Sequence, residues 1–174
     1  MKDVKIVLLG YMGSGKTTVG RIVANHLNIK FLDLDAFIED GEDMTVATIF
    51  EKKGEIYFRK KEAEYLHKIF LNEDSFVLSL GGGTPCFGDN MKFINTQTNN
   101  SFYLNVGIGE LTERLSQEKS HRPMIAHLHD EELTEFIGKH LFERSFFYNK
   151  AHQKVKSNKN TPTEIAEMII NRLV

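Results

Sequence analysis

The sequence has few of the residues that cross-link or interrupt a chain. Its 174 residues include one cysteine and three prolines. The lone Cys86 cannot form an internal disulfide, which excludes a disulfide-stapled secreted scaffold. With so few prolines, no proline-rich linker divides the chain. The length also suits one compact unit, so we expect a single domain over residues 1–174.

Long apolar runs and an excess of one charge are missing as well. The longest apolar run covers residues 6–9, far below the roughly 18 residues that a membrane span needs. The 22 basic and 24 acidic residues give a net charge of −2, which provides no footprint for nucleic acid or a membrane surface. Asp3 and Lys5 argue against a signal peptide. We expect a soluble, cytoplasmic monomer that binds neither nucleic acid nor membrane.

Short apolar runs alternate with segments of helical periodicity along the chain. Residues 4–9, 31–34, 76–80 and 102–106 are apolar enough to be buried strands, and 153–156 is a weaker candidate. Apolar residues recur at helical spacing over 19–27 and 56–70. A capping box formed by Thr161 and Glu164, with Pro162 between them, predicts a last helix through Leu173. The alternation predicts an α/β fold of three layers, with a parallel sheet of about five strands between helices.

Residues 116–130 fit neither a helix nor a strand. The stretch is polar, contains Pro123 and lies between two helical patterns. A loop of this length in a compact domain is either functional or disordered. Its histidines, at 121, 127 and 129, raise the possibility of a metal site. A solvated loop is the better interpretation, because a structural zinc site takes four ligands.

The strongest chemical signal is GYMGSGKT at residues 10–17, which has the phosphate-loop pattern G-x-x-x-x-G-K-[ST]. It follows an apolar strand and opens an amphipathic helix, as the pattern requires. Glycines let backbone N–H groups and the helix N-terminus face a polyphosphate, which Lys16 also reaches, while the Thr17 hydroxyl ligates Mg²⁺. We expect a nucleotide here, bound by Gly13, Ser14, Gly15, Lys16, Thr17 and Thr18.

Two carboxylates and three glycines follow the next two strands. On a strand, Asp33 and Asp35 would face the same side, roughly 6 to 7 Å apart. Beside a phosphate loop they are candidates for metal and acceptor contacts, and a cap at Asp35 beside a solvated Asp33 is the alternative. Gly81, Gly82 and Gly83 leave room for a ligand to approach the backbone, and a flexible turn is the alternative.

Arginine is scarce, since only six of the 22 basic residues are arginine and the rest are lysine. In such a chain an arginine is more often needed for its planar fork of donors than for charge alone. The six lie at positions 21, 59, 114, 122, 144 and 172.

Taken together, these segments resemble the shikimate kinase family over nearly the whole chain. The match rests on GYMGSGKTTVGR at 10–21, DLD at 33–35, GEIYFRKKE at 54–62, GGG at 81–83, RP at 122–123 and ER…Y…A at 143–151. Many unrelated ATPases share the phosphate loop, whereas the combination is specific to this family. The resemblance implies a nucleoside monophosphate kinase-like fold with strand order 2-3-1-4-5. It also implies that ATP phosphorylates the 3-hydroxyl of shikimate, on the route to aromatic amino acids.

The resemblance further implies how the acceptor is bound. Asp35 would contact the acceptor hydroxyls, and Arg59 and Arg144 would clamp the shikimate carboxylate. The backbone of Gly81, Gly82 and Gly83 would line the same pocket. The helical segment at about 35–62 would bind the substrate, and the loop at about 116–130 would be a flexible lid.

On the nucleotide side, Arg122 resembles the lid arginine that closes over the phosphates, and Arg114 the arginine that packs on adenine. Thr17 and, through water, Asp33 resemble the magnesium ligands. Lys16, Asp35 and Arg122 would then be the catalytic residues, with Asp35 holding the attacking hydroxyl and accepting its proton.

Some positions depart from the family pattern or stay ambiguous. Leu80 precedes the glycines where many relatives have threonine, and residues 156–160 lack an arginine that some relatives place there. Phe50 and Phe58 are equally consistent with core and with walls of the acceptor pocket. Another small-molecule kinase of this fold, for gluconate or a nucleoside monophosphate, is the alternative function. A GTP-dependent switch is the remaining alternative, although residues 158–161 lack the aspartate of an N-K-x-D segment.

Overall fold

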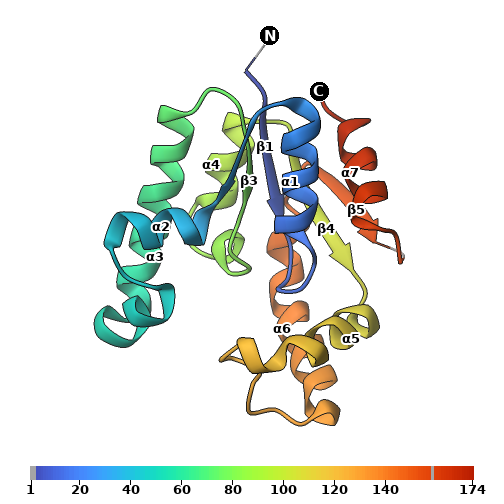
Figure 1. Ribbon diagram of the computed structural model, residues 1–174. Coiled ribbons are helices and arrows are strands. Elements are labelled where there is room, and N and C mark those ends of the chain that lie inside the picture. The colour runs from blue at the N-terminus through green and yellow to red at the C-terminus, as the bar shows by residue number, and fades with distance from the viewer. Residues whose placement is uncertain (1–2, 158) are drawn as a thin grey trace.

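The computed structural model describes residues 3–157 and 159–174, built around a five-stranded parallel sheet (Figure 1). The strands are β1 (Lys5–Leu9), β2 (Lys30–Asp33), β3 (Phe76–Ser79), β4 (Ser101–Val106) and β5 (Gln153–Ser157). Their order across the sheet is β2-β3-β1-β4-β5. Both the predicted α/β class and the strand order implied by the resemblance are confirmed.

The central strand β1 shows why the fold has three layers. Ile6 and Leu8 face one side of the sheet and Val7 and Leu9 face the other, and all four are fully buried. Because successive side chains of a strand point to opposite faces, each pair belongs to a separate apolar core. A strand with two apolar faces needs helices on both sides of its sheet.

The helices divide between these two cores. The core containing Ile6 and Leu8 is completed by α1 (Lys16–Leu27) and α7 (Pro162–Ile170). The core containing Val7 and Leu9 is completed by α2 (Leu34–Glu42), α3 (Val46–Asn72), α4 (Asn90–Gln97), α5 (Ile108–Glu118) and α6 (Asp130–Tyr148). Two short 3₁₀ turns, η1 (Thr84–Cys86) and η2 (Lys119–His121), complete the described elements.

The last helix begins as its capping residues predict. The Glu164 N–H donates to Thr161 Oγ1 at 3.3 Å, and the Thr161 N–H donates to Glu164 Oε2 at 2.7 Å. The helix ends at Ile170, however, and not at Leu173. Among the described residues, none of the helices is both long and apolar enough to span a membrane.

The segment predicted to bind substrate, residues 35–62, consists of α2 and the first part of α3. Gly54, with φ of 81° and ψ of 171°, breaks α3 into two helical stretches. The hydroxyls of Tyr57 and Tyr65 both donate to Glu42 at the end of α2, which ties α2 to the second stretch. Arg59 therefore lies on a stretch whose position is set by α2 and by the core beneath it.

The expectation that residues 116–130 contain no regular structure is wrong in part. Helix α5 continues through Glu118, η2 follows directly, and α6 begins at Asp130. Midway along the segment, Ile125 is fully buried in the core that contains Val7 and Leu9. The segment crosses the lower end of the molecule in Figure 1, near the carboxyl ends of the strands. It is thus attached to the core by an apolar side chain between polar stretches.

Candidate active site

The phosphate loop joins β1 to α1 at the carboxyl edge of the sheet. Gly13 and Gly15 have φ of 78° and 89°, in the left-handed region that favours glycine. A Cβ on Gly13 would also lie 2.9 Å from Leu115 Cδ2, so a side chain there would have to displace Leu115 of α5. Gly15 is the N-cap of α1, and the loop therefore turns directly into the first turn of that helix.

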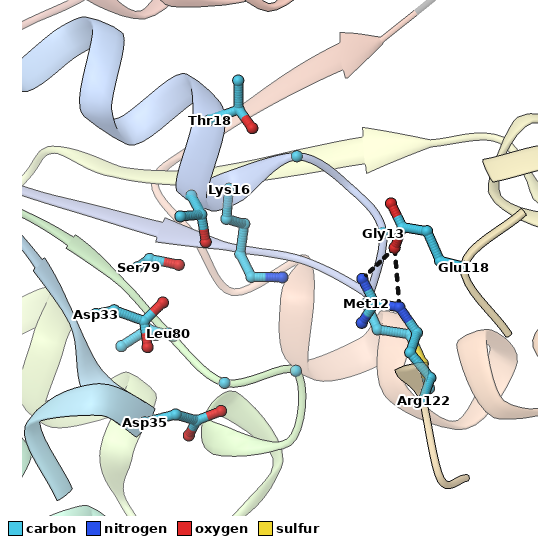
Figure 2. A pocket seen from close by; sticks show the side chains of 14 residues that line it. Met12, Gly13, Lys16, Thr18, Asp33, Asp35, Ser79, Leu80, Glu118 and Arg122 are labelled. Atoms are coloured by element: carbon cyan, nitrogen blue, oxygen red, sulfur yellow. Dashed lines mark hydrogen bonds and ion pairs between the residues drawn. The ribbon is translucent and has the colours of Figure 1, made fainter. Parts of the chain in front are cut away.

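Lys16 extends from α1 into the space inside the loop, in the pocket that Asp33 and Asp35 also line (Figure 2). Its ammonium donates to the carbonyls of Gly10 at 2.8 Å and Tyr11 at 3.0 Å. Burial lowers the pKa of Lys16 to about 8, and Asp35 and Asp33 partly oppose this shift. The loop thus holds a buried positive charge beside its backbone N–H groups.

A pocket of about 320 Å³ opens in front of the loop. Ten residues expected at the site line it, namely Gly13, Gly15, Lys16, Thr17, Thr18, Asp33, Asp35, Gly81, Gly82 and Arg122. Four others that we did not expect also line it, namely Met12, Ser79, Leu80 and Glu118. The expected Ser14 is buried under the loop and lines a neighbouring pocket on the other side.

The geometry expected for the two aspartates is wrong. Strand β2 ends at Asp33, whose Oδ1 accepts the Ala36 N–H at 3.2 Å and caps α2. Asp35 lies in the first turn of α2, so the two do not form an i, i+2 pair on a strand. The capping residue is therefore Asp33 and not Asp35. Both nevertheless line the pocket, because α2 starts at the carboxyl edge of the sheet.

Asp35 lies in an environment that disfavours its charge. Its pKa is raised to about 6, first by burial and then by the carboxylates of Asp33 and Glu62, while Lys16 opposes the shift. A carboxylate with a pKa near neutrality is suited to accept a proton in catalysis. Burial and neighbouring like charges at one pocket-lining residue are typical of functional sites.

A second pocket of about 320 Å³ shares Met12, Asp35, Gly81, Gly82 and Arg122 with the first. Its other lining residues are Val46, Phe50, Phe58, Arg59, Glu62, Gly83, His121, Pro123, Met124 and Arg144. Phe50 and Phe58, expected either in the core or as pocket walls, both line this pocket, with their ring centroids 4.7 Å apart. Phe58 is in addition part of the core.

A buried glutamate holds one nitrogen of the Arg59 guanidinium group. Its Nη1 donates to Glu62 Oε1 at 3.0 Å, and Glu62 is only 1% exposed. The Thr84 hydroxyl donates to the other oxygen, Glu62 Oε2, at 2.7 Å. Glu62 is therefore fully paired, and it links α3 to the turn that follows the glycine triplet. The FRKKE segment contains this residue, but the sequence pattern alone did not reveal its part in the site.

Arg144 enters the same pocket from α6. Within the described part of the chain, none of the carboxylates forms an ion pair with it. One helical turn further on, the buried Tyr148 hydroxyl donates to the Gly82 carbonyl at 2.6 Å. Burial raises the pKa of Tyr148, and the charge of Arg144 opposes this. A half-buried guanidinium that lacks a carboxylate partner is suited to bind an anion.

The glycine triplet is needed for close approach and not for an unusual backbone conformation. None of the three glycines has positive φ. A Cβ on Gly81 would lie 3.1 Å from Asp35 Oδ1, and one on Gly82 would lie 3.1 Å from Arg144 Nη1. At Gly83 it would lie 2.7 Å from Arg59 Nη2. The triplet therefore lets one carboxylate and two guanidinium groups converge on the same backbone.

Two further arginines expected at the site, Arg122 and Arg114, are held by glutamates on α5. Arg122 donates through Nε and Nη2 to Glu118 Oε2, at 3.0 and 2.6 Å, at the rim of both pockets. Arg114 donates to the Gly13 carbonyl at 3.1 Å and pairs with Glu110. It lines a third pocket that also includes residues 160, 162 and 165. Of the segment 156–160, position 158 lies outside the described residues.

Comparison with protein families shows which family the chain belongs to. The family model described as shikimate kinase matches residues 12–174. The chain belongs to the shikimate kinase family. It is 43% identical to the shikimate kinase of Flavobacterium psychrophilum over 95% of this chain and 96% of the relative. With the shikimate kinase of Flavobacterium johnsoniae it shares 44% identity over 97% and 98% of the two chains.

Solved structures of shikimate kinases are also similar. The enzyme from Bacteroides thetaiotaomicron matches with a TM-score of 0.86 and 38% identity, over 97% of this chain and 95% of the other. The Acinetobacter baumannii shikimate kinase in complex with shikimate matches with a TM-score of 0.82 and 31% identity, over 97% and 91%. A gluconokinase from Sinorhizobium meliloti, at 16% identity and a TM-score of 0.57, shares the fold alone.

Proposed function

We propose that the chain transfers a phosphoryl group from ATP to the 3-hydroxyl of shikimate, in the biosynthesis of aromatic amino acids. Membership of the family supports the activity, and a similar shikimate kinase has been solved with shikimate bound. The two pockets meet at Asp35, Gly81 and Gly82, which suits transfer of a group between two bound molecules.

The observation that carries the proposal is the convergence of Arg59 and Arg144 on the glycine triplet. They come from α3 and α6, so only the folded chain brings them together. A carboxylate is the anion that planar guanidinium groups bind with two parallel hydrogen bonds. Asp35, at the other end of the triplet, supplies an acceptor for a hydroxyl of the same molecule. A ring that carries both a carboxylate and hydroxyl groups fits this arrangement.

The first pocket suits the triphosphate of ATP and a magnesium ion. The oxygen atoms available to a metal ion around Lys16 are the Thr17 hydroxyl, the Asp33 carboxylate and the Ser79 hydroxyl. Ser79 lies opposite Asp33 in the register of β2 and β3. Mg²⁺ is commonly bound by one or two such groups together with substrate phosphates. When bound, Mg²⁺ would neutralise charge on the phosphates. Ser79 thus provides a hydroxyl next to Leu80, where many relatives have threonine.

The chain's own residues position and neutralise the reacting groups. With its pKa near 6, Asp35 is ionised at neutral pH, so it can orient the attacking hydroxyl and accept its proton. When ATP binds, the Lys16 ammonium exchanges its hydrogen bonds to the loop carbonyls for hydrogen bonds to phosphate oxygens. The negatively charged phosphates attract the ammonium more strongly than neutral carbonyls do. Arg122 leaves Glu118 to reach the phosphates when residues 116–130 close over them, which excludes water. Arg114 packs beside adenine at the third pocket.

A coupled kinase assay with shikimate, gluconate and AMP as separate acceptors tests the proposal. We expect ATP-dependent turnover with shikimate and at least a hundredfold lower kcat/KM with the other two. A preference for gluconate or AMP would overturn the proposal. A chromatographic size measurement tests the expectation of a monomer, and fractionation of cells tests the expected cytoplasmic location.

A further inference from the structure

The guanidinium of Arg59 is only partly held by its ion pairs. Nη1 bonds to Glu62, and Nε lies 3.5 Å from Glu55 Oε1. Within the described residues, Nε is buried without a hydrogen-bond partner. The Glu55 side chain is 56% exposed, so it constrains Arg59 weakly. One firm hydrogen bond at one corner leaves the planar group free to tilt.

Phe87 covers the face of this guanidinium. The centroid of the Phe87 ring lies 3.9 Å from Arg59 Cζ, whereas the rings of Phe58 and Phe50 lie 5.2 and 5.9 Å away. At 3.9 Å the ring is in van der Waals contact with the planar cation, where the negative face of the ring attracts it. The contact is long-range, because Phe87 follows η1 while Arg59 lies on α3.

Residues 83–87 therefore contact the guanidinium group on two sides. The backbone of Gly83 lies against Nη2, and Phe87 lies over the face. Between them, Thr84 holds Glu62, which in turn holds Nη1. Through these contacts, residues 83–87 restrict the position of Nη2, support the hydrogen bond of Nη1 and restrict the plane of the guanidinium group.

Phe87 has neither a direct role in the acceptor pocket nor a core to fill. It is absent from the residues that line the acceptor pocket and lines two neighbouring pockets instead, both of which also include Arg59. The residue stays 36% exposed and belongs to neither of the two apolar cores of the described residues. The contact with Arg59 is the interaction that accounts for its position.

We propose that Phe87 is a positioning residue for the acceptor, and that it acts through Arg59. Its ring holds the plane of the guanidinium, and with it the direction of the N–H groups that Glu62 leaves unpaired and that would meet the substrate carboxylate. The inference rests on the proposed function, in which Arg59 binds the carboxylate of shikimate. Positioning a donor before binding lowers the entropy lost on association, so the effect falls on acceptor affinity.

Three variants separate this role from simple packing. Phe87→Leu keeps the apolar bulk but removes the ring face, whereas Phe87→Tyr keeps the face. Phe93→Leu is the matched control, because Phe93 lines one of the two pockets that Phe87 lines, and its ring stacks on His67 and not on Arg59. Steady-state kinetics give KM for each substrate and kcat, and thermal unfolding monitors the fold of every variant.

We expect Phe87→Leu to raise KM for shikimate about two- to thirtyfold, the range that a cation–π contact supports. kcat and KM for ATP stay within twofold of the parent enzyme. Phe87→Tyr restores KM to within twofold, and Phe93→Leu leaves it unchanged. If Phe87→Tyr is as impaired as Phe87→Leu, or if both match the parent, the inference is overturned.

A double-mutant cycle distinguishes failure of this inference from failure of the proposed function. In an Arg59→Lys background, the ring has no planar group to orient, so adding Phe87→Leu should change KM less than twofold. If Arg59→Lys raises KM but Phe87→Leu has the same effect in both backgrounds, Phe87 does not act through Arg59. If Arg59→Lys leaves KM unchanged, the role given to Arg59 in the proposed function is wrong, and the inference fails with it.

Discussion

Lys16 and Asp35 line the first pocket, which we propose binds the nucleotide and call the nucleotide pocket. Burial disfavours the charge of both side chains. Burial lowers the pKa of Lys16 to about 8 and raises that of Asp35 to about 6. Near pH 7 both groups still carry charge, at a cost to the folded state. Such a cost is typical of residues retained for their chemistry, and a bound polyphosphate or hydroxyl group relieves it.

Lys16→Ala should abolish kinase activity without lowering the temperature of unfolding. The side chain points into the pocket in front of the phosphate loop. Its removal deletes a charge that, within the described residues, is hydrogen-bonded to the carbonyls of Gly10 and Tyr11 and to the Ser14 hydroxyl, all in the loop itself. The coupled assay and thermal unfolding measure the two effects. Lys30→Ala is the control, because Lys30 is 64% exposed and pairs with Glu73 at the surface. Parental turnover in Lys16→Ala would refute the phosphate-loop assignment.

Asp35→Asn should lower kcat strongly and raise stability at pH 7.5. An amide is a poor proton acceptor, so turnover falls even at saturating shikimate. The folded-state pKa of about 6 lies above the ordinary value of 3.8, so folded Asp35 holds its proton more tightly than the unfolded chain does. Stability therefore falls as pH rises from about 4 to 6, and the full cost persists above that.

The asparagine variant should remove this cost, a gain of up to about 3 kcal/mol at pH 7.5 for a pKa that is raised from 3.8 to about 6. The gain should vanish below about pH 4, where Asp35 is protonated in both states. Urea unfolding at pH 7.5 and pH 4 measures the difference. A variant that is less stable than the parent at pH 7.5 contradicts the argument, and unchanged turnover removes Asp35 from the mechanism.

At the scale of elements, local sequence patterns predicted the strands, the phosphate loop and the glycine triplet well. The boundary between β2 and α2 was missed, because it depends on the Asp33 cap and on burial of Leu34, neither of which alters the apolar pattern. The role of Glu62 was also missed. Its partner Thr84 is 22 residues away, and only the packing of α3 against η1 brings them together. Long-range polar pairs of this kind have no periodic signal.

The three arginines at the pockets come from different elements, and their replacement by lysine should have different kinetic effects. In the proposed function, Arg59 on α3 and Arg144 on α6 bind a carboxylate that is the same in the ground state and the transition state. Arg59→Lys or Arg144→Lys should therefore raise KM for shikimate, about ten- to a hundredfold for a loss of 1.5 to 3 kcal/mol. Arg122 lies in the segment between α5 and α6 and meets charge that redistributes during transfer, so Arg122→Lys should mainly lower kcat.

Steady-state kinetics with each substrate varied in turn measure these changes. Arg172→Lys is a suitable control, because Arg172 is exposed near the end of the chain and bonds to the Lys154 carbonyl. Direct binding of shikimate should be weakened by the Arg59 change and nearly unaffected by the Arg122 change. If Arg122→Lys raises KM alone while Arg59→Lys lowers kcat alone, the two roles have been exchanged.

For the whole molecule, the two pockets lie at one edge of one sheet and share residues, yet they rely on different parts of the chain. The nucleotide pocket uses the loop between β1 and α1, whereas the acceptor pocket uses α3, the triplet and α6. Tyr11 of the loop and the helices α3 and α6 all pack on the core that contains Val7 and Leu9. Occupation of either pocket should therefore stabilise the whole fold, and each ligand can be followed separately.

Either ligand at a hundred times its Kd should add about 2.7 kcal/mol to the free energy of unfolding. For a domain of this length the unfolding temperature then rises by about 5 to 11 °C. Thermal unfolding with ATP–Mg²⁺ or with shikimate alone measures the shifts. Lys16→Ala should lose most of the ATP shift and keep the shikimate shift, whereas Arg144→Lys should do the reverse. If either variant loses both shifts equally, the substitution has disrupted the edge of the sheet that the two pockets share. In that case the two pockets do not bind their ligands through separate residues.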